Sequence, residues 1–362
     1  MLDNQSNQAD NATTLPTITA SDILSGTYVD LALDATGYIR YRGQVVAKLL
    51  KGDDFYSPSI LLQVCSSEQD EEVKTYLSNF LYHALSTGLE PIFCLKNADK
   101  LSAKAKEVAD IVVSNYGSVR RYILADKLKE LDPFDRVTLR QLKIRFGRFH
   151  VYIPMMLKPG QVKLLLMLWY LQDMSGADQG EELLEKLLLG RTTLERSQDI
   201  SDIYYKLSGY DFWGSFAIRV DITDRLSNYI QEALNWREGV TPKPVGAYNG
   251  YRFVLSPLVL STLGVGYDQA VLIFKALGYV HNRVAYDADQ APNAFQIRSE
   301  DSEDLKMDVW TFVCKKPKSN PKVQAKDKPR NKKHHPSRPK KEKEIDMNSP
   351  FAVLLKLQKG SA

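Results

Sequence analysis

The lysine- and proline-rich tract near the C-terminus limits most strongly what this chain can fold into. Residues 315–347 contain no aromatic residue, and residues 315–343 hold 13 Lys and Arg against 2 acidic residues. A segment of this composition buries too little apolar surface to form a core. We therefore expect a disordered linker at residues 314–347 and a second disordered tail at the polar residues 1–20. The folded part must then lie within residues 21–313.

The net charge is divided unevenly between this tract and the rest of the chain. Residues 315–343 carry +11, whereas the remaining 333 residues hold 35 Lys and Arg against 42 Asp and Glu, a net charge of −7. The basic isoelectric point therefore comes from the tract, and the folded part is mildly acidic. Because the distribution of charge decides whether nucleic acid is a plausible partner, the folded part needs a locally basic surface to bind it.

The apolar residues and cysteines exclude several classes of protein. The longest apolar run, Leu164 to Leu171, has eight residues, whereas a membrane-spanning helix needs about 20. No Lys or Arg precedes Arg40, so neither a secretory signal nor an Arg-rich transit peptide is expected. The three cysteines are too widely spaced for a disulfide framework or a zinc knuckle. These features indicate a cytoplasmic protein that binds no membrane.

Hydrophobic periodicity predicts an α+β fold, with an N-terminal β-hairpin and helical domain at residues 21–196. Short β-rich segments separated by Gly-containing turns predict hairpins, and the amphipathic segments that follow predict helices. The expected strands are Tyr28–Leu33, Tyr38–Tyr41, Gln44–Leu50, Ile60–Val64 and Ile144–Ile153, and the expected helices are Asp70–Leu85, Ala103–Asn115, Lys127–Leu131, Pro133–Leu142 and Gln161–Met174.

Residues 197–313 predict a small winged-helix-like α+β domain. The expected elements are a strand at Ala217–Val220, a helix capped by Asp221 that runs to about Asn235, a loop at Trp236–Gly250, short helices at Ser256–Leu263 and Tyr267–Leu277, and wing strands at Tyr279–Ala285 and Val309–Val313. The second short helix offers only Lys275 as a cation, and residues 198–313 hold 10 basic and 15 acidic residues. We therefore expect a structural unit rather than a reader of DNA sequence.

The sequence contains none of the common motifs of catalytic or metal chemistry. No Gly-Lys dipeptide occurs, so there is no phosphate-binding Gly-x-x-x-x-Gly-Lys-Ser/Thr loop. Neither His-Glu-x-x-His nor Cys-x-x-Cys occurs, so spacing indicates no metal site. The acidic run Asp70-Glu71-Glu72 lacks the preceding hydrophobic strand of a Walker B box, and we interpret it as a solvated helix start. We expect no catalytic residue, no metal and no cofactor on this chain.

Residues 119–163 are the locally basic part of the folded region. They hold 11 Lys and Arg against 4 acidic residues, and the run from Ile144 to Tyr152 interleaves cations with aromatic rings. On a continuous strand, Phe146, Arg148, His150 and Tyr152 would share one face, and the alternate residues would face the core. Cations beside exposed rings suit single-stranded nucleic acid, through phosphate contacts and base stacking.

The candidate nucleic-acid-binding residues are Arg120, Arg121, Arg140, Lys143, Arg145, Arg148, His150, Tyr152 and Lys158. The same pattern is also typical of a half-buried strand, in which Phe146 and Tyr152 belong to the core and the arginines are merely solvated. The sequence leaves both interpretations open.

The last residues predict a short amphipathic helix at 348–360. A serine–proline pair suits its N-terminus, and Gly360 suits its C-terminus. Its apolar side consists of the candidate partner-binding residues Phe351, Leu354 and Leu355. Because so short a helix is marginal in water on its own, we expect it to fold by docking, either on a partner or back on its own domain.

Several short runs, taken together, resemble the C-terminal region of one helicase family. They are, in chain order, Leu49-Leu50-Lys51-Gly52-Asp53-Asp54, the stretch from Ile144 to Pro154 followed by Leu157-Lys158-Pro159, Ala217-Ile218-Arg219-Val220-Asp221, Leu277-Gly278-Tyr279, and Asn348-Ser349-Pro350-Phe351-Ala352. In this order and spacing they resemble the alphaproteobacterial helicases related to the mitochondrial degradosome RNA helicase. The resemblance covers about residues 21–313 and the final helix.

In that family a motor of two RecA-like domains precedes this region, and the phosphate loop of such a motor is missing from these 362 residues. The resemblance therefore implies an accessory module of a helicase that binds RNA or single-stranded DNA without sequence specificity, with ATP only on a separately encoded motor. A second interpretation is a protein-interaction scaffold that recruits a partner through its C-terminal helix. A third interpretation is an independent enzyme, which no sequence motif supports.

Overall fold

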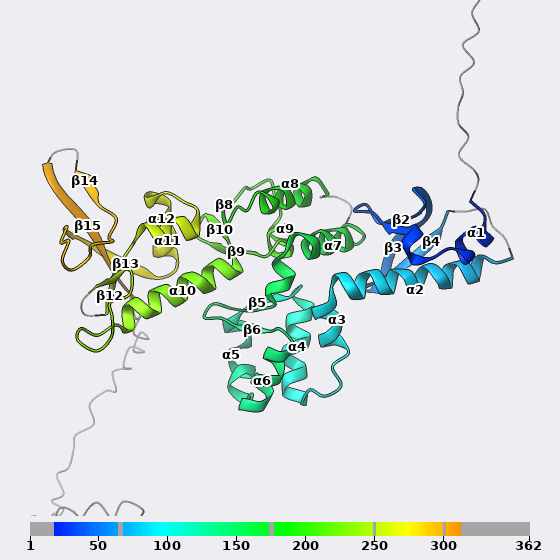
Figure 1. The fold of residues 1–362 in the computed structure, drawn as a ribbon, viewed down its shortest axis with the longest axis horizontal. Helices are drawn as coiled ribbons and strands as arrows, with labels where there is room; N and C mark the ends of the chain where they lie inside the picture. Colours follow the sequence, from blue (N-terminus) through cyan, green and yellow to red (C-terminus); the bar gives the residue numbers. More distant parts are fainter. Residues whose placement is uncertain (1–17, 64–67, 174–176, 249–250, 300–301, 313–362) are drawn as a thin grey trace, which may run out of the picture. The chain divides into compact units, whose positions relative to one another are not determined.

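The computed structural model describes residues 18–63, 68–173, 177–248, 251–299 and 302–312. These residues form a mixed α+β structure with four small antiparallel sheets, which confirms the fold class predicted from the sequence (Figure 1). They all fall within one unit, Met1–Val313. Apart from residues 18–20, the expected N-terminal tail lies outside the described residues. So do the basic linker and the terminal helix with Phe351, Leu354 and Leu355.

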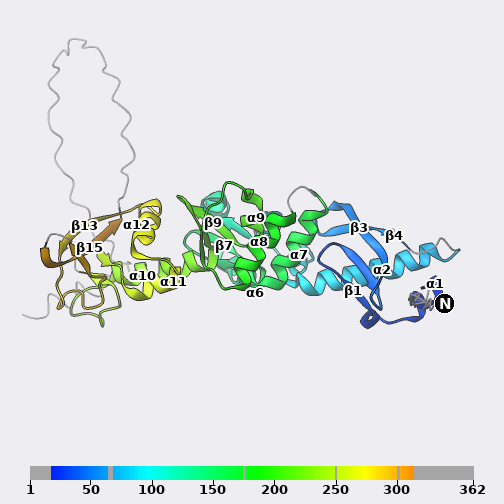
Figure 2. The ribbon, with the colours of Figure 1, turned by 90° about the horizontal axis from the view of Figure 1, so that it is seen from above.

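The first sheet is an antiparallel meander with a long helix along it. Its strands are β1 (Leu31–Leu33), β2 (Tyr38–Tyr41), β3 (Gln44–Asp54) and β4 (Ser57–Leu62), in that order, and the helix is α2 (Asp70–Gly88). The apolar side of α2 that the sequence predicts, including Leu77 and Leu81, is buried. Figure 2 shows α2 lying along the sheet, beside β1 and β4. The strand expected at Tyr28–Leu33 is shorter than predicted, because its first half forms the 3₁₀ turn η1 (Tyr28–Asp30).

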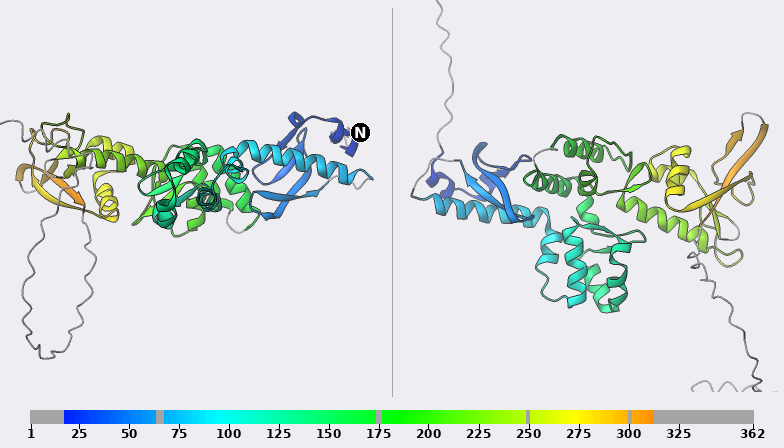
Figure 3. Two further views of the ribbon diagram at one scale, coloured as in Figure 1. Left: turned by 90° about the horizontal axis from the view of Figure 1, so that it is seen from below. Right: turned by 180° about the vertical axis from the view of Figure 1, so that it is seen from behind.

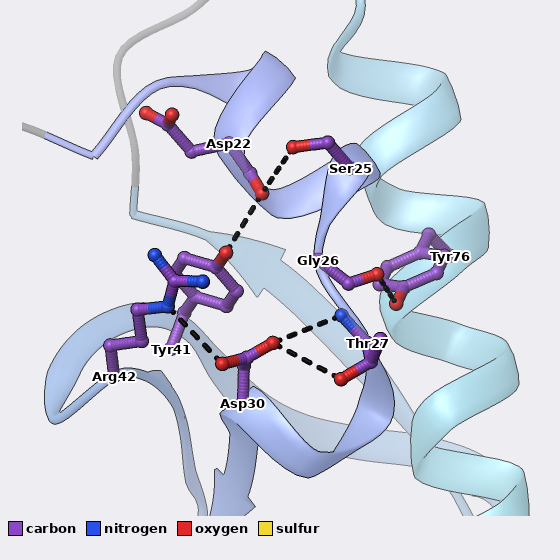
Figure 4. A network of polar contacts seen from close by, with 8 residues as sticks. All are labelled: Asp22, Ser25, Gly26, Thr27, Asp30, Tyr41, Arg42 and Tyr76. Atoms are coloured by element: carbon purple, nitrogen blue, oxygen red, sulfur yellow. Dashed lines mark hydrogen bonds and ion pairs between the residues drawn. The ribbon is translucent and has the colours of Figure 1, made fainter.

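Polar contacts fasten the short helix α1 (Ala20–Ser25) and η1 to this sheet and helix (Figure 4). The hydroxyl of Tyr41 donates to the carbonyl of Asp22 at 2.9 Å, and the hydroxyl of Tyr76 on α2 donates to the carbonyl of Gly26 at 2.9 Å. Asp30 accepts the backbone N–H of Thr27 and pairs with Arg42. The N-terminal segment is therefore built into the first sheet and its helix.

Short helices surround the second sheet, which contains most of the basic segment. The helices are α3 (Glu90–Lys96), α4 (Ala103–Ser114), α5 (Ala125–Glu130) and α6 (Pro133–Gln141), with the 3₁₀ turns η2 (Arg121–Leu124) and η3 (Pro154–Leu157). The strands β5 (Ser118–Arg120), β6 (Arg145–Phe146) and β7 (His150–Tyr152) pair in the order β5–β7–β6. The single strand expected at Ile144–Ile153 is therefore wrong. The chain reverses at residues 147–149, and Arg145 lies opposite Tyr152 in an antiparallel hairpin.

The third sheet joins residues on both sides of the domain boundary expected after residue 196. It has the order β8–β10–β9, and it packs with the helices that precede it. The elements are α7 (Pro159–Tyr170), α8 (Ala177–Leu188), β8 (Thr193–Glu195), α9 (Asp202–Leu207), β9 (Tyr210–Trp213) and β10 (Phe216–Arg219). Strand β8 precedes the expected boundary and pairs with β10, which follows it.

The last part follows the element order of a winged helix. After α10 (Val220–Asn235) come β11 (Ala247–Tyr248), β12 (Arg252–Val254), α11 (Pro257–Leu263), α12 (Tyr267–Ala276), β13 (Tyr279–Ala285), β14 (Ile297–Ser299) and β15 (Ser302–Phe312). The strand order β12–β15–β13 places the wing hairpin beside the strand that follows α10, and the hairpin is drawn in orange in Figure 3. Trp310, Phe274 and Phe253 form the centre of its core.

Several details of this part differ from the sequence prediction. Strand β11 lies within the stretch expected to be a loop, Trp236–Gly250, and β12 and β14 were not expected. Helix α10 begins at Val220, and Asp221 lies in its first turn paired with Arg219, so Asp221 is not its N-cap. The last strand begins at Ser302, seven residues before its expected start at Val309. Within the described ranges, no single helix has both the length and the apolar composition to cross a membrane. Only the bent pair α11 and α12 meets those criteria jointly.

Candidate nucleic-acid interface

The basic segment gathers its cations around two surface hollows. The larger hollow, of about 570 Å³, is lined by Arg120, Arg121, Tyr122, Ala125, Leu128, Lys129, Arg136, Arg148, Phe149 and Trp213. We call it the arginine groove. Five of its ten lining residues are cations, three are aromatic, and none is acidic. The residues come from the end of β5, η2, α5, α6, the turn between β6 and β7, and the end of β9.

Three guanidinium groups of the arginine groove are bonded only to neutral acceptors in the described part of the chain. Arg121 donates from Nη1 to the carbonyl of Gly147 at 2.7 Å, and Arg148 donates from Nη1 to Oε1 of Gln231 at 3.3 Å. Arg136 donates from Nη2 to the carbonyl of Leu128. Because a neutral acceptor does not cancel the charge, these three positive charges remain available to an anion in the groove.

The other two cations of the arginine groove have carboxylate partners. Lys129 pairs with Asp126 at 2.7 Å, and both side chains are largely exposed. Arg120 makes two hydrogen bonds to Asp211, at 2.7 and 2.8 Å, and a third to the carbonyl of Phe212 at 2.8 Å. Arg120 therefore acts mainly as a rigid wall of the groove.

A partly buried cluster of Arg120, His150 and Asp211 centres on the carboxylate of Asp211. His150 Nε2 lies 2.6 Å from Asp211 Oδ2, and the His150 side chain is almost fully buried. Burial alone would raise the pKa of Asp211, but hydrogen bonds from His150 and Arg120 outweigh burial and lower the pKa to about 2. Asp211 is therefore ionised at neutral pH and holds β5 and β7 against β9.

The aromatic rings of the arginine groove differ in how open they are. The guanidinium of Arg120 lies 5.5 Å from the ring of Trp213, and Phe149 packs edge-on against the same ring at 5.0 Å. Both rings also pack against the core of the winged-helix-like part. Tyr122, by contrast, is 70% exposed. Tyr122 is therefore the ring of the groove with a surface free to stack on a base.

The smaller hollow, of about 560 Å³, contains the remaining basic candidates. Arg140, Lys143, Arg145 and Lys158 line it, together with Phe146 and one acidic residue, Glu90. The guanidinium of Arg140 lies 5.7 Å from the ring of Phe146. We call this hollow the β6 hollow. The fold thus divides the predicted site residues into two groups, with Arg120, Arg121 and Arg148 in the arginine groove and the other four exposed cations in the β6 hollow.

Two predicted site residues face the interior instead of a ligand. Tyr152 is completely buried and donates its hydroxyl to Asp224 Oδ2 at 3.1 Å, and His150 is 2% exposed. Burial raises the pKa of Tyr152 to about 12, so its hydroxyl stays protonated. The expectation that these two side chains contact nucleic acid is wrong, because the hairpin turns both of them toward β9 and α10. Arg145, a candidate that a continuous strand would place on the opposite face from Tyr152, is exposed.

Five of the eight charged and aromatic residues of the arginine groove were not predicted from the sequence. Tyr122, Lys129, Arg136, Phe149 and Trp213 line it but were not among the predicted site residues. Lys129 and Arg136 belong to the basic segment, so their charge alone could have placed them among the candidate binding residues. Trp213 lies far along the chain, in β9, and the side-chain contacts of β9 with the basic segment are not visible from local sequence.

The described residues contain no group of three or more His, Cys, Asp or Glu side chains placed to hold a metal ion. Comparison of the chain with protein-family models, with curated proteins and with solved structures found no match.

Proposed function

We propose that this chain binds single-stranded RNA or DNA in the arginine groove, without sequence specificity. The observation that carries the proposal is the lining of the groove, which combines five cations and three aromatic rings and includes no carboxylate. Phosphate contacts supply affinity for any strand, and stacking on an aromatic face accepts any base. Since the folded part of the chain is acidic overall, a group of five cations, three of which have no carboxylate partner among the described residues, needs a specific reason.

The exposure of Tyr122 favours a single strand over a duplex. A base can stack on this ring only if it is free of its neighbours and of a pairing partner, which is the usual state in a single strand. Arg121, Arg136 and Arg148 then lie around the ring as phosphate contacts. Hydrogen bonds to protein acceptors already hold these guanidinium groups in place, so little conformational freedom is lost when a phosphate binds.

The wider role that we propose is that of an accessory module beside a helicase motor. It rests on the resemblance to the C-terminal region of the alphaproteobacterial helicases, together with the lack of a phosphate loop in this sequence. ATP would act on the separate motor, and this chain would hold the strand. Recruitment of a partner by the terminal helix falls outside the described residues, and no structural observation supports it.

The test is binding of a fluorescent single-stranded oligonucleotide of mixed sequence to the full chain, followed by anisotropy. We expect the double variant Arg121→Gln/Arg148→Gln to weaken binding at least tenfold, because two unopposed charges are removed. Tyr122→Ala should weaken it by a further ~1–3 kcal/mol, and Tyr122→Phe should restore it, because stacking needs only the ring.

The matched control is Lys51→Gln, which removes one positive charge from an exposed position on β3. This variant should bind like the parent protein. The proposal fails if the double variant keeps its melting temperature and binds the oligonucleotide as tightly as Lys51→Gln does.

A further inference from the structure

The loop between α10 and β12 presents three pairs of a cation stacked over an aromatic ring. Arg237 lies 3.8 Å from the ring centre of Tyr251, Lys243 lies 4.9 Å from that of Trp236, and Arg252 lies 5.0 Å from that of Tyr248. All three cations are exposed. This loop belongs to the winged-helix-like part and contributes no residue to the arginine groove.

The pair of Arg237 and Tyr251 is fixed in place from both sides. Arg237 Nη1 donates to the carbonyls of Trp236 and Asn235, at 3.0 and 3.4 Å. Tyr251 has a backbone φ of +61°, a conformation that bulky residues rarely adopt and that is often found at functional positions. Tyr251 covers one face of the guanidinium, and because Arg237 is exposed, the opposite face is open to solvent.

The second pair adds a fixed charge beside the first. Trp236 directly precedes Arg237, and its indole Nε1 donates to the carbonyl of Thr241 at 3.1 Å, which orients the ring. Lys243 Nζ donates to the carbonyl of Gln290. Among the residues that the structure describes, neither Arg237 nor Lys243 has a carboxylate partner. Both charges are therefore unopposed, although the winged-helix-like part as a whole is acidic.

We propose that the open face of Arg237, backed by Tyr251, is a second stacking platform for a base of single-stranded nucleic acid, with Lys243 as its phosphate contact. A planar guanidinium stacks on bases as aromatic rings do, and a guanidinium held in one plane loses little freedom on binding. The platform takes the same class of ligand as the arginine groove and in that respect rests on the proposed function. It also reverses the usual arrangement of a winged helix, because the loop after α10 binds the strand and α12 does not.

The experiment compares two charge-removing variants of the full chain, Arg237→Gln and Lys275→Gln. Lys275 is an exposed cation on α12 of the same winged-helix-like part. The probes are a fluorescent 12-nucleotide single strand and the same strand with abasic sites throughout. With the ordinary strand, we expect Arg237→Gln to bind at least fivefold more weakly than Lys275→Gln. With the abasic strand, the two variants should bind equally, because only the base contact distinguishes them.

A second measurement keeps the platform separate from the groove. Ultraviolet crosslinking of a strand that carries 4-thiouridine should give a crosslinked peptide that contains Tyr251, and this peptide should persist in the Tyr122→Ala variant. Equal binding of Arg237→Gln and Lys275→Gln to the ordinary strand, with loss of binding in the groove variants, would overturn the platform alone. If neither set of variants changes binding, the proposed function itself fails. Competition by a polyglutamate peptide as strong as that by the unlabelled strand would assign the loop to acidic proteins instead.

Discussion

His150 Nε2 and Asp211 Oδ2 lie 2.6 Å apart and join β7 to β9 across 61 residues of sequence. Because an ionised carboxylate can only accept hydrogen bonds, Nε2 of His150 is the donor in this contact. The same carboxylate accepts two hydrogen bonds from Arg120, which lines the arginine groove. One partly buried acidic side chain thus contacts both the interior strand β7 and a wall of the groove.

The stability of the protein should depend on the ionisation of Asp211. The folded-state pKa of about 2 lies below the ~3.9 of an unfolded chain, so this contribution is complete above about pH 4 and is lost as the pH falls toward 2. Denaturant unfolding at pH 6 and pH 2.5 should show that Asp211→Asn loses roughly 2 kcal/mol less stability than the parent over this interval. Equal losses in the two proteins would show that Asp211 does not couple folding to acid.

Tyr152 should behave as a core residue. Tyr152→Ala should lower the free energy of unfolding by about 3–5 kcal/mol, because a large buried side chain is deleted. Tyr152→Phe should lower it by about 1–3 kcal/mol, because Asp224 loses the hydroxyl of a buried partner. Urea unfolding measures both values. A Tyr152→Ala protein as stable as the parent would contradict the buried position.

The guanidinium groups of the arginine groove should determine how steeply binding falls with salt. Each phosphate contact to a single strand contributes about 0.7 to the slope of log K against log salt concentration. The single variants Arg121→Gln, Arg136→Gln and Arg148→Gln should each reduce that slope by about this amount. Anisotropy titrations at four salt concentrations provide the slopes. A slope that is unchanged in all three variants would place the phosphate contacts elsewhere.

The basic tract should add weak and unspecific affinity for nucleic acid. Its charge of +11 within 29 residues attracts any polyanion, and the attraction falls steeply as salt rises. A protein cut after Val313 should bind single-stranded RNA more weakly than the full chain at low salt and nearly equally at high salt. If both proteins bind with the same affinity at low salt, the tract takes no part in binding.

The purified chain should hydrolyse no ATP, with or without nucleic acid. Hydrolysis by a helicase motor needs a Gly-Lys phosphate loop, and no Gly-Lys dipeptide occurs in the sequence. A coupled ATPase assay in the presence of single-stranded RNA checks this directly. Turnover that survives every purification step and co-elutes with the chain would refute the prediction.

Local sequence predicted the regular elements well, because each of them follows a simple period or a turn signal. The apolar side of α2, the hairpin of β2 and β3, and the succession of α10, α11, α12 and β13 are all visible in the pattern of apolar residues and glycines. The hairpin of β6 and β7 was missed, because its alternation of cations and rings also fits one continuous strand. The turn depends on Gly147, where a Cβ atom would lie 2.4 Å from Asp224 Oδ1, 77 residues away.

The candidate site was predicted only in part, for a related reason. The charge of the basic segment is a local property, so Arg121 and Arg148 could be found from sequence. The burial of His150 and Tyr152 depends on Asp211 and Asp224, and the groove depends on Trp213, all of which are distant in sequence. Such side-chain contacts between residues distant in sequence leave no periodic pattern in the basic segment itself.

If the arginine groove and the Arg237 platform bind one strand as proposed, helix α10 sets the distance between the two contacts. Arg148 reaches Gln231 on this helix, and the helix leads directly into Trp236 and Arg237. Five helical residues span about 8 Å, which corresponds to two or three stacked nucleotides. A dinucleotide can then occupy one surface only, whereas a strand a few nucleotides longer can engage both at once and gain the effective concentration of a tethered ligand. The affinity of this protein for single strands should therefore rise steeply over the first few added nucleotides and then level off. The strand length at which it levels off is set by the distance that α10 spans between the two surfaces.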